Sequence, residues 1–253
     1  MKIVAIVQSH MGSTRLPGKV LLDLAGEPML VRDMNRLSRA QTLDKVVVAT
    51  TVNLADDAIV GLCAKHGWPC FRGSEEDVLD RYYRAAAEYE ADAVVRITSD
   101  CPLIEPEVVD RVVREFLERQ PEVDYACNTL PRRTFPRGLD TEVSRFDVLE
   151  RAWHEDHDPS WREHVTPYIR RNPELFRIHG IMSEVDYSHM RWTVDTPEDL
   201  VFVRHIYEYF GHDRFSWQDV LALLKEHPEW LKINQHVLQK TIGGDADATK
   251  NYN

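Results

Sequence analysis

Short apolar runs alternate with longer segments of helical periodicity along the first half of the chain. The apolar runs stand at residues 2–7, 45–50 and 93–98. They are rich in β-branched residues and little interrupted by polar ones, which is typical of strands buried on both faces. Between them, the helical period predicts amphipathic helices over residues 28–39, 55–66 and 75–90. This alternation predicts a largely parallel sheet with helices on both faces.

Local signals mark the ends of two of these helices. Gly67 follows the second helix and fits a left-handed C-terminal cap. Ser74 precedes the third, with Asp77 three residues on, which is the pattern of a capping box. We therefore expect the third helix to begin directly after Ser74.

The second half of the chain is less regular and predicts a mixed sheet with an antiparallel excursion after about residue 125. Residues 139–144 alternate and fit an antiparallel strand, and 177–182 and 190–194 are further candidates. Helices are predicted over residues 161–171, 197–209 and 217–226. Because no linker rich in Pro, Gly or Ser interrupts the chain, residues 1–242 are interpreted as a single domain and residues 243–253 as a flexible C-terminal tail.

Composition and charge narrow the functional classes. The 253 residues are 43% hydrophobic and 29% charged, as in an ordinary soluble globular protein. The net charge of −11 disfavours nonspecific binding to nucleic acid or to an anionic membrane. No run approaches the roughly 18 apolar residues of a transmembrane helix, and no signal-peptide pattern opens the chain, so a cytoplasmic protein is expected. The four cysteines form no CxxC pair, and reduced thiols are expected.

The segment from residue 8 to residue 19, QSHMGSTRLPGK, carries the most chemistry in the chain. It follows the first predicted strand, at the carboxyl end where open α/β sheets bind ligands. Gly12 and Gly18 allow the backbone to approach a ligand, Ser13 adds a hydroxyl, and Arg15 and Lys19 supply positive charge. These groups suit a nucleoside triphosphate. A glycine-containing turn with solvated basic residues is an equally good interpretation of the residue types alone.

Two familiar phosphate-binding motifs are absent from this loop. The P-loop GxxxxGK[ST] has four residues between its glycines, whereas five separate Gly12 from Gly18. Val20 also stands where the metal-binding hydroxyl of a P-loop would be. The dinucleotide fingerprint GxGxxG is absent as well.

Two aspartates are candidates for binding a divalent metal. Asp100 follows the third predicted strand, so its carboxylate can face the same crevice as the loop. Its other interpretation is a turn residue before Pro102. Asp195 precedes a second capping box, in which Thr196 fits the N-cap and Asp199 the third helical position. Because that box accounts for Asp199, Asp195 is favoured as the metal ligand.

Six segments carry a family likeness: residues 8–19, 48–51, 72–81, 97–103, 135–140 and 194–199. They resemble the cytidylyltransferases that activate acidic sugars, especially the spore-coat polysaccharide biosynthesis F-type group, which is related to 3-deoxy-manno-octulosonate and acylneuraminate cytidylyltransferases. The resemblance implies a single nucleotidyltransferase domain with a Rossmann-like nucleotide-diphospho-sugar transferase fold. It also implies a homodimeric enzyme of polysaccharide biosynthesis that uses Mg²⁺ to transfer CMP from CTP to a small acidic acceptor and releases pyrophosphate.

The resemblance further assigns roles to individual residues. Arg15, Lys19 and Asp100 are expected to be catalytic, and Asp100 and Asp195 are expected to bind the metal. The residues expected to bind the nucleotide are Gln8, Gly12, Ser13, Arg15, Lys19, Arg72, Gly73, Ser74 and Asp100. The residues expected to bind the acceptor are Arg137, Asp140, Glu142, Arg162 and His164. A capped helix start is the alternative for residues 72–74, and a solvated loop or helix face is the alternative for the acceptor residues.

Two positions depart from the family's usual pattern, and other functions stay open. His10 stands where an arginine is common, and Ser99 where a glycine is common, which leaves the exact nucleotide contacts open. A nucleotidyltransferase with a phosphonate acceptor fits the same residues. A nucleotide-sugar-dependent glycosyltransferase usually needs an Asp-x-Asp motif, but Thr98 stands two residues before Asp100. A non-catalytic nucleotide-binding protein is the third alternative, although it has no need of so many charged site residues.

Overall fold

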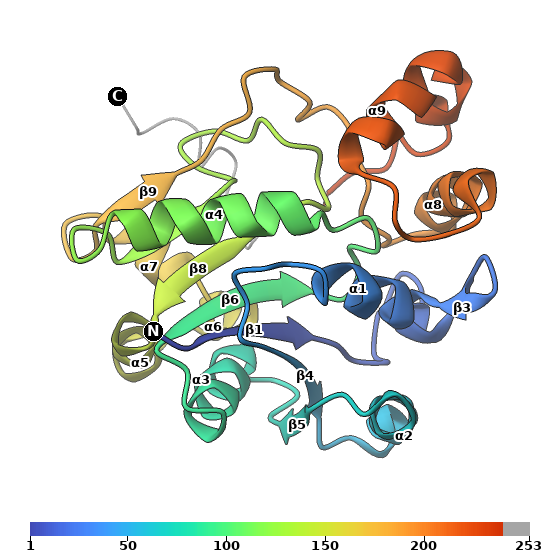
Figure 1. Ribbon diagram of the computed structural model, residues 1–253. Helices are drawn as coiled ribbons and strands as arrows, with labels where there is room; N and C mark the ends of the chain where they lie inside the picture. The colour runs from blue at the N-terminus through green and yellow to red at the C-terminus, as the bar shows by residue number, and fades with distance from the viewer. Residues whose placement is uncertain (240–253) are drawn as a thin grey trace.

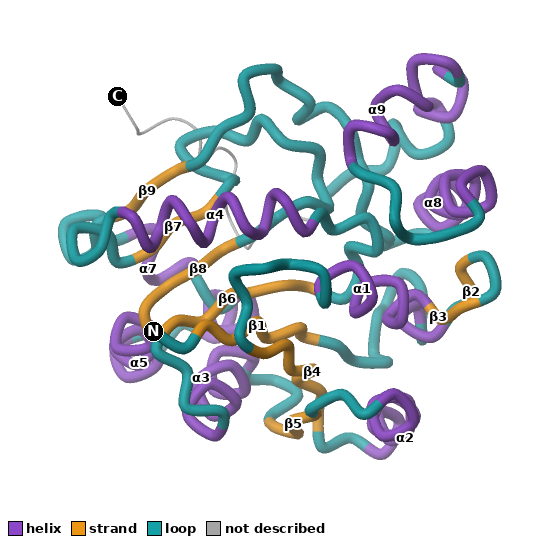
Figure 2. The backbone as a smooth tube through the Cα atoms, in the orientation of Figure 1, coloured by secondary structure: helices purple, strands orange, loops and turns teal. Residues whose placement is uncertain are grey.

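A seven-stranded mixed sheet forms the centre of the computed structural model, which describes residues 1–239 (Figures 1 and 2). The strand order is β5-β4-β1-β6-β8-β7-β9. The strands are β1 (Ile3–Gln8), β4 (Lys45–Thr51), β5 (Cys70–Gly73), β6 (Ala93–Thr98), β7 (Tyr125–Cys127), β8 (Glu142–Arg145) and β9 (Ile178–Gly180). Neighbouring strands are parallel except at β8, which is antiparallel to both β6 and β7. A small antiparallel hairpin consists of β2 (Asp23–Leu24) and β3 (Glu27–Pro28).

The helices of residues 1–239 cover both faces of this sheet (Figure 1). They are α1 (Met29–Leu37), α2 (Asp57–His66), α3 (Val78–Glu88), α4 (Pro106–Glu118), α5 (Phe146–Glu155), α6 (Pro159–His164), α7 (Pro167–Arg171), α8 (Pro197–Phe210) and α9 (Trp217–Glu226), with short 3-10 helices η1 (Lys19–Leu21), η2 (Leu54–Asp56) and η3 (Pro228–Lys232). Alternate residues of β1 point into two cores. Ala5 and Val7 pack with α1, α2, α4, α8 and α9, whereas Val4 and Ile6 pack with α3 and α5. The central strand is therefore buried on both faces, as its sequence predicts.

The predicted fold class is confirmed, because the sheet is mostly parallel, has helices on both faces and contains one antiparallel excursion. The predicted strands at residues 2–7, 45–50 and 93–98 correspond to β1, β4 and β6. The predicted helices at residues 217–226 and 197–209 correspond to α9 and α8. Gly67 ends α2 with a φ of 69°, so the predicted left-handed cap is confirmed.

Three local predictions are wrong. The third helix begins at Val78, because Asp77 and not Ser74 is its N-cap and accepts a hydrogen bond from the backbone N–H of Asp80 at 2.9 Å. Residues 161–171 form no single helix, since Val165 adopts a φ of 71° and separates α6 from α7. Residues 190–194 form no strand and contribute only an isolated bridge to Arg137.

The helices α4 and α5 and the strands β5 and β7 were not predicted from the pattern of the sequence. The α4 segment has a recognisable signal, a proline at the first helical position followed by apolar residues at helical spacing. The apolar residues are Val108, Val109, Val112, Val113 and Phe116. By contrast, β7 has only three residues, which is too short for a period to appear.

Three further expectations concern the chain as a whole. No helix within residues 1–239 is long and apolar enough to cross a membrane. The four cysteines are free thiols. The predicted domain end at residue 242 and the predicted tail at residues 243–253 lie outside the described residues.

Candidate active site

Lys19 joins the two predicted metal ligands at the carboxyl end of the parallel strands. Its ammonium group donates hydrogen bonds to Asp100 Oδ2, Asp195 Oδ1 and the backbone oxygen of Val194, each at 2.9 Å. Burial alone would lower the pKa of Lys19, but the two carboxylates outweigh burial and raise it. Gly18 precedes Lys19 with a φ of 67°, a conformation that favours glycine and turns the chain into η1. Three segments that are far apart in the sequence thus meet at the ammonium group of Lys19.

Asp100 is fixed at the end of β6 by contacts on both of its oxygens. Oδ1 accepts a hydrogen bond from the Thr98 hydroxyl at 2.6 Å, and Oδ2 accepts the one from Lys19. Burial alone would raise the pKa of Asp100, but Lys19 and these hydrogen bonds lower it to about 2. The Thr193 hydroxyl also donates to the backbone oxygen of Asp100 at 3.0 Å, which fastens the second aspartate's segment to the first.

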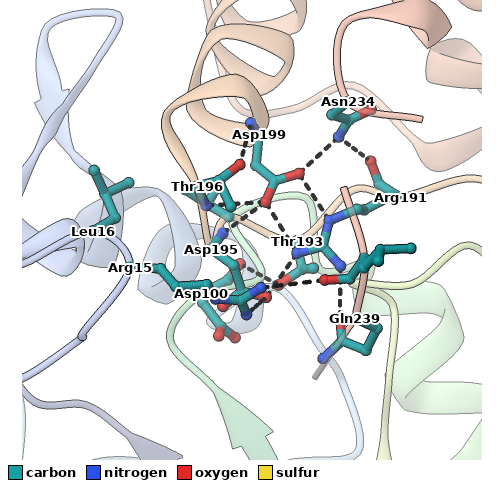
Figure 3. Close-up of polar contacts among 12 residues, drawn as sticks. Arg15, Leu16, Asp100, Arg191, Thr193, Asp195, Thr196, Asp199, Asn234 and Gln239 are labelled. Atoms are coloured by element: carbon teal, nitrogen blue, oxygen red, sulfur yellow. Dashed lines mark hydrogen bonds and ion pairs between the residues drawn. The ribbon is translucent and has the colours of Figure 1, made fainter. Parts of the chain in front are cut away.

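Asp195 is surrounded by basic side chains (Figure 3). Its Oδ2 lies 2.8 Å from Arg15 Nη2 and 2.7 Å from Arg191 Nη2. The predicted capping box follows directly at the start of α8. The side chains of Thr196 and Asp199 each accept a hydrogen bond from the backbone N–H of the other residue. Asp199 also forms an ion pair with Arg191 at 2.8 Å. The box therefore accounts for Asp199 in the structure as it does in the sequence.

The two carboxylates fit a divalent cation that also binds a phosphate ligand. Asp100 and Asp195 each place one oxygen 2.9 Å from the same nitrogen, so a small cation in that position can reach both. Mg²⁺ in nucleotide sites commonly takes one or two carboxylates and completes its shell with phosphate oxygens and water. The described residues contain no cluster of three or more potential metal-ligating side chains.

A cleft of about 750 Å³ lies beside the loop of residues 8–19. It is lined by Gln8, His10, Gly12, Glu75, Glu76, Val78, Arg81, Pro159, Ser160, Glu163 and His164. The structure thereby brings together two predicted nucleotide residues, Gln8 and Gly12, and one predicted acceptor residue, His164. A Cβ atom at Gly12 would lie 3.2 Å from the His10 ring, so glycine keeps this wall of the cleft open.

Both histidines of the cleft favour the neutral form. Burial and the nearby charge of Arg81 lower the pKa of His10. Burial and Arg96 do the same for the pKa of His164. A neutral imidazole has one donor and one acceptor, so these residues offer hydrogen bonds rather than charge. His10 therefore does not replace the permanent charge of the arginine that is common in the resembling family.

The 72–74 segment has contacts of its own within the protein. Arg72 is paired with Asp57 at 2.7 Å and donates to the backbone oxygens of Thr51 and Asn53. A Cβ atom at Gly73 would lie 2.9 Å from the ring of Phe71, so packing favours glycine there. These contacts are structural. A role for Arg72, Gly73 and Ser74 in nucleotide binding stays a prediction.

The Ser13 and Ser74 hydroxyls both serve local turns. Ser13 Oγ accepts a hydrogen bond from the Leu16 amide at 3.4 Å, and Ser74 Oγ accepts one from the Asp77 amide at 3.0 Å. The first turn precedes η1 and the second precedes α3. A hydroxyl that accepts a bond still has its own proton to donate, so both remain candidates for phosphate contact.

The predicted acceptor residues differ in whether their charges are paired. Glu142 accepts hydrogen bonds from Arg96, Tyr125 and Thr166, and Asp140 forms a two-pronged ion pair with Arg133. Arg162 is bound to Asp77 at 2.8 Å. The Arg137 guanidinium has no ion-pair or hydrogen-bond partner among residues 1–239. Burial and the neighbouring Arg133 lower the pKa of Arg137, and the charge of Asp140 offsets this only in part.

Comparisons with known proteins assign the family. The model of the cytidylyltransferase family matches residues 4–216. The chain belongs to the cytidylyltransferase family. A protein of unknown activity from Methanocaldococcus jannaschii is 38% identical over 95% of this chain and 98% of its own. The spore coat polysaccharide biosynthesis protein SpsF from Bacillus subtilis is 31% identical over 90% and 95% of the two chains. The enzyme is therefore a nucleotidyltransferase that uses CTP, and the resemblance drawn from its sequence is confirmed.

Two further matches agree with this assignment. The 3-deoxy-manno-octulosonate cytidylyltransferase of Chlorobium chlorochromatii is 30% identical over 75% of this chain and 71% of its own. The solved structure of a cytidylyltransferase from Leptospira borgpetersenii covers 95% of this chain and 100% of its own, at 35% identity and a TM-score of 0.88. The family assignment favours nucleotidyltransfer over the glycosyltransferase and the non-catalytic alternatives.

Arg191 is the principal site residue that sequence reasoning missed. It binds both Asp195 and Asp199, yet it stands in a segment interpreted as a strand. The only signal in the sequence was its position four residues before Asp195. That spacing predicts a contact between the two side chains only if the segment turns, and not if it is an extended strand. Arg81 was missed as well, because a helical arginine beside acidic residues is ordinary on a solvated face.

Proposed function

We propose that the enzyme transfers CMP from CTP to a small acidic acceptor and releases pyrophosphate, with Mg²⁺ held by Asp100 and Asp195. The observation that carries this proposal is the convergence of Lys19, Asp100 and Asp195 at the carboxyl end of β1 and β6. A buried lysine that bridges two carboxylates provides the cation and the anions that a metal–triphosphate complex needs. The relationship to a spore coat polysaccharide biosynthesis protein supports a place in polysaccharide biosynthesis.

The proposed reaction is a direct displacement at phosphorus. A hydroxyl oxygen of the acceptor forms a bond to the α-phosphorus of CTP, the bond from that phosphorus to the bridging oxygen breaks, and pyrophosphate leaves. The hydroxyl proton passes to water. Arg15 and Lys19 stabilise the negative charge that develops on the phosphate oxygens, and the bound metal would supply further charge stabilisation there. Both cations form ion pairs with Asp195, so a triphosphate competes with Asp195 for them.

The charges of the cleft favour a neutral group rather than the phosphates. Its lining contains three glutamates, Glu75, Glu76 and Glu163, and one arginine, Arg81. An anionic group placed there meets net repulsion, whereas a base or sugar can use the neutral histidines. The cleft therefore fits the nucleoside or the hydroxyl-rich part of the acceptor, while Lys19 and Arg15 fit the triphosphate.

Arg137 is the proposed contact for the acceptor's acid group. A half-buried guanidinium without a partner in the described part of the chain gains from binding an anion, and its planar group can donate two parallel hydrogen bonds to a carboxylate. A phosphonate has the same charge and spacing of oxygens, so it is the second candidate class of acceptor. Asp140 pairs with Arg133 beside Arg137, and its negative charge offsets part of the positive potential at this point.

Binding and turnover experiments test the proposal in sequence. Calorimetric titration with CTP, UTP, ATP and GTP, with and without Mg²⁺, should show selective and Mg²⁺-dependent CTP binding that weakens in Asp100→Asn. Pyrophosphate release is then measured with sugar acids and with phosphonates as acceptors. Binding of another nucleotide in preference to CTP, or full activity in Asp100→Asn, would contradict the proposal. The homodimer implied by the resemblance is tested by sedimentation of the same sample.

A further inference from the structure

The two carboxylate oxygens of Asp195 have different kinds of partner. Oδ1 faces Lys19 and, through it, Asp100. Oδ2 accepts from two arginines, Arg15 at 2.8 Å and Arg191 at 2.7 Å. Only Oδ1 is therefore directed toward the position that the proposed metal shares with Asp100, and the arginines hold the carboxylate in that orientation.

Arg191 has the geometry of a fixed support. Its Nε donates to Asp199 Oδ1 at 2.8 Å and its Nη2 to Asp199 Oδ2 at 3.0 Å, a two-pronged contact with a fully buried carboxylate. Arg191 itself is only 8% exposed. Because Asp199 is locked into the capping box of α8, the guanidinium is tied to a rigid helix end.

A segment from the far end of the described chain completes this support (Figure 3). The Asn234 side chain donates to the backbone oxygen of Arg191 at 2.9 Å and to Asp199 Oδ1 at 3.0 Å. Gln239 Oε1 accepts from Arg191 Nη1 at 2.5 Å. The backbone oxygen of Leu238 lies 3.4 Å from Arg15 Nη1. Both arginines that contact Asp195 Oδ2 thus also contact residues 234–239.

We infer that Arg191 is a positioning residue for Asp195, and that Gln239 acts through Arg191 to set the metal affinity of the site. The inference rests on the proposed metal site at Asp100 and Asp195. Groups that orient a metal-ligating carboxylate typically change metal affinity by about 10- to 100-fold when removed. Gln239 is one step further from the metal, so we expect a smaller effect, of about threefold, from its loss.

Charge and orientation predict opposite results for this support, which makes the inference testable. An arginine beside a carboxylate neutralises part of its charge and, by electrostatics alone, weakens metal binding. Loosening Arg191 would then strengthen metal binding. If orientation dominates, loosening Arg191 weakens metal binding. Gln239→Ala loosens one contact without changing the net charge, so it separates the two effects.

The experiment measures Mn²⁺ binding to the full-length chain in the presence of CTP by electron paramagnetic resonance, which needs no turnover. The variant is Gln239→Ala, and Gln235→Ala is the matched control because Gln235 is an exposed glutamine of the same segment. Gln239→Glu keeps the acceptor atom and serves as the rescue. We expect the Mn²⁺ dissociation constant to rise about threefold in Gln239→Ala and to stay at or below the wild-type value in Gln239→Glu.

The outcomes separate this inference from the proposed function. A dissociation constant for Gln239→Ala that equals that of Gln235→Ala, or falls below it, would overturn the positioning role. If Asp100→Asn and Asp195→Asn also leave Mn²⁺ binding unchanged, the proposed metal site is wrong. If those two variants weaken binding and Gln239→Ala does not, only the positioning inference fails. Arg191→Lys, checked for folding by circular dichroism, should weaken binding more than Gln239→Ala because lysine cannot hold both aspartates.

Discussion

Two groups of buried ion pairs in this enzyme have similar contact distances and differ in what surrounds them. The site cluster (Lys19, Asp100 and Asp195) has contacts of 2.9 Å, and the sheet cluster (Arg96, Glu142 and Thr166) has an ion pair of 2.7 Å. The Asp100 side chain is 25% exposed, whereas the Glu142 side chain is 7% exposed. The cavity beside Glu142 has only about 10 Å³, hardly the space of one water molecule. Short ion pairs therefore do not by themselves mark a functional site; access to a ligand does.

The largest expected effect is at the site cluster. We expect Asp100→Asn and Asp195→Asn each to lower kcat about 10³-fold, since each removes a proposed metal contact at the developing charge. Stopped-time assays of pyrophosphate release measure this loss. Asp186→Asn, at an exposed turn residue, is the control and should keep wild-type activity. Activity within tenfold of wild type in both site variants would remove the functional distinction between the clusters.

At the sheet cluster, substitution should lower the stability of the fold rather than the activity. Glu142→Gln leaves the Arg96 charge without its partner, and breaking a buried pair of this kind typically costs about 3 kcal/mol. Urea denaturation at pH 7 measures the free energy of unfolding, with the exposed Glu118→Gln as the control. A large loss of acceptor affinity without loss of stability would place Glu142 in the acceptor site, as the family resemblance implies.

Arg137 should affect binding of one substrate only. Removing a hydrogen bond to a charged group costs about 2 kcal/mol, so Arg137→Ala should raise the KM of the acceptor about 30-fold and leave the KM of CTP unchanged. Arg132→Ala, an exposed arginine of the same loop, is the matched control. An equal rise in both KM values would show that Arg137 serves the nucleotide or the fold.

The smallest expected effect is a dependence of stability on pH, which arises from Glu142 in the sheet cluster. Burial alone would raise the pKa of Glu142, but Arg96 and the surrounding donors lower it below its ordinary value of 4.5. Glu142 therefore adds stability that is present above pH 4.5 and is lost as the pH falls through its lowered pKa. The stability difference between wild type and Glu142→Gln should shrink as the pH is lowered below 4.5. A constant difference across that range would show that the cost of the variant comes from packing rather than charge.

The sequence predicts well those features that neighbouring residues determine. The strand β6 and the helix α9 have the predicted bounds, and the Thr196–Asp199 capping box is present, because periodicity and capping act over a few residues. Asp100 and Asp195 both contact Lys19. Their closeness was expected from the crevice at the carboxyl end of the strands and from the family likeness. Which charges are already paired could not be predicted. The partners of Arg162 and Glu142 lie up to 85 residues away and depend on the packing of α6 and α7.

The break between α6 and α7 at Val165 is a second feature that local sequence does not predict. Residues 161–171 have a helical pattern, but the backbone turns at Val165, which has a φ of 71° and is almost fully buried. A β-branched residue in this conformation is costly, so tertiary packing must compensate for it. The turn places the Thr166 hydroxyl on Glu142, a contact that no local pattern contains.

The contact of Leu238 with Arg15 also has a consequence for the timing of synthesis. The two residues are 223 positions apart in the chain. At about 5–20 residues per second, a ribosome needs roughly 10–45 s to travel that distance. Asp195 is made 43 residues before Leu238, so for roughly 2–9 s of that time the nascent chain has both metal-ligand candidates but lacks the segment that contacts Arg15 and Arg191. Under the role inferred for Gln239, full metal affinity therefore arises only after residue 239 has been made.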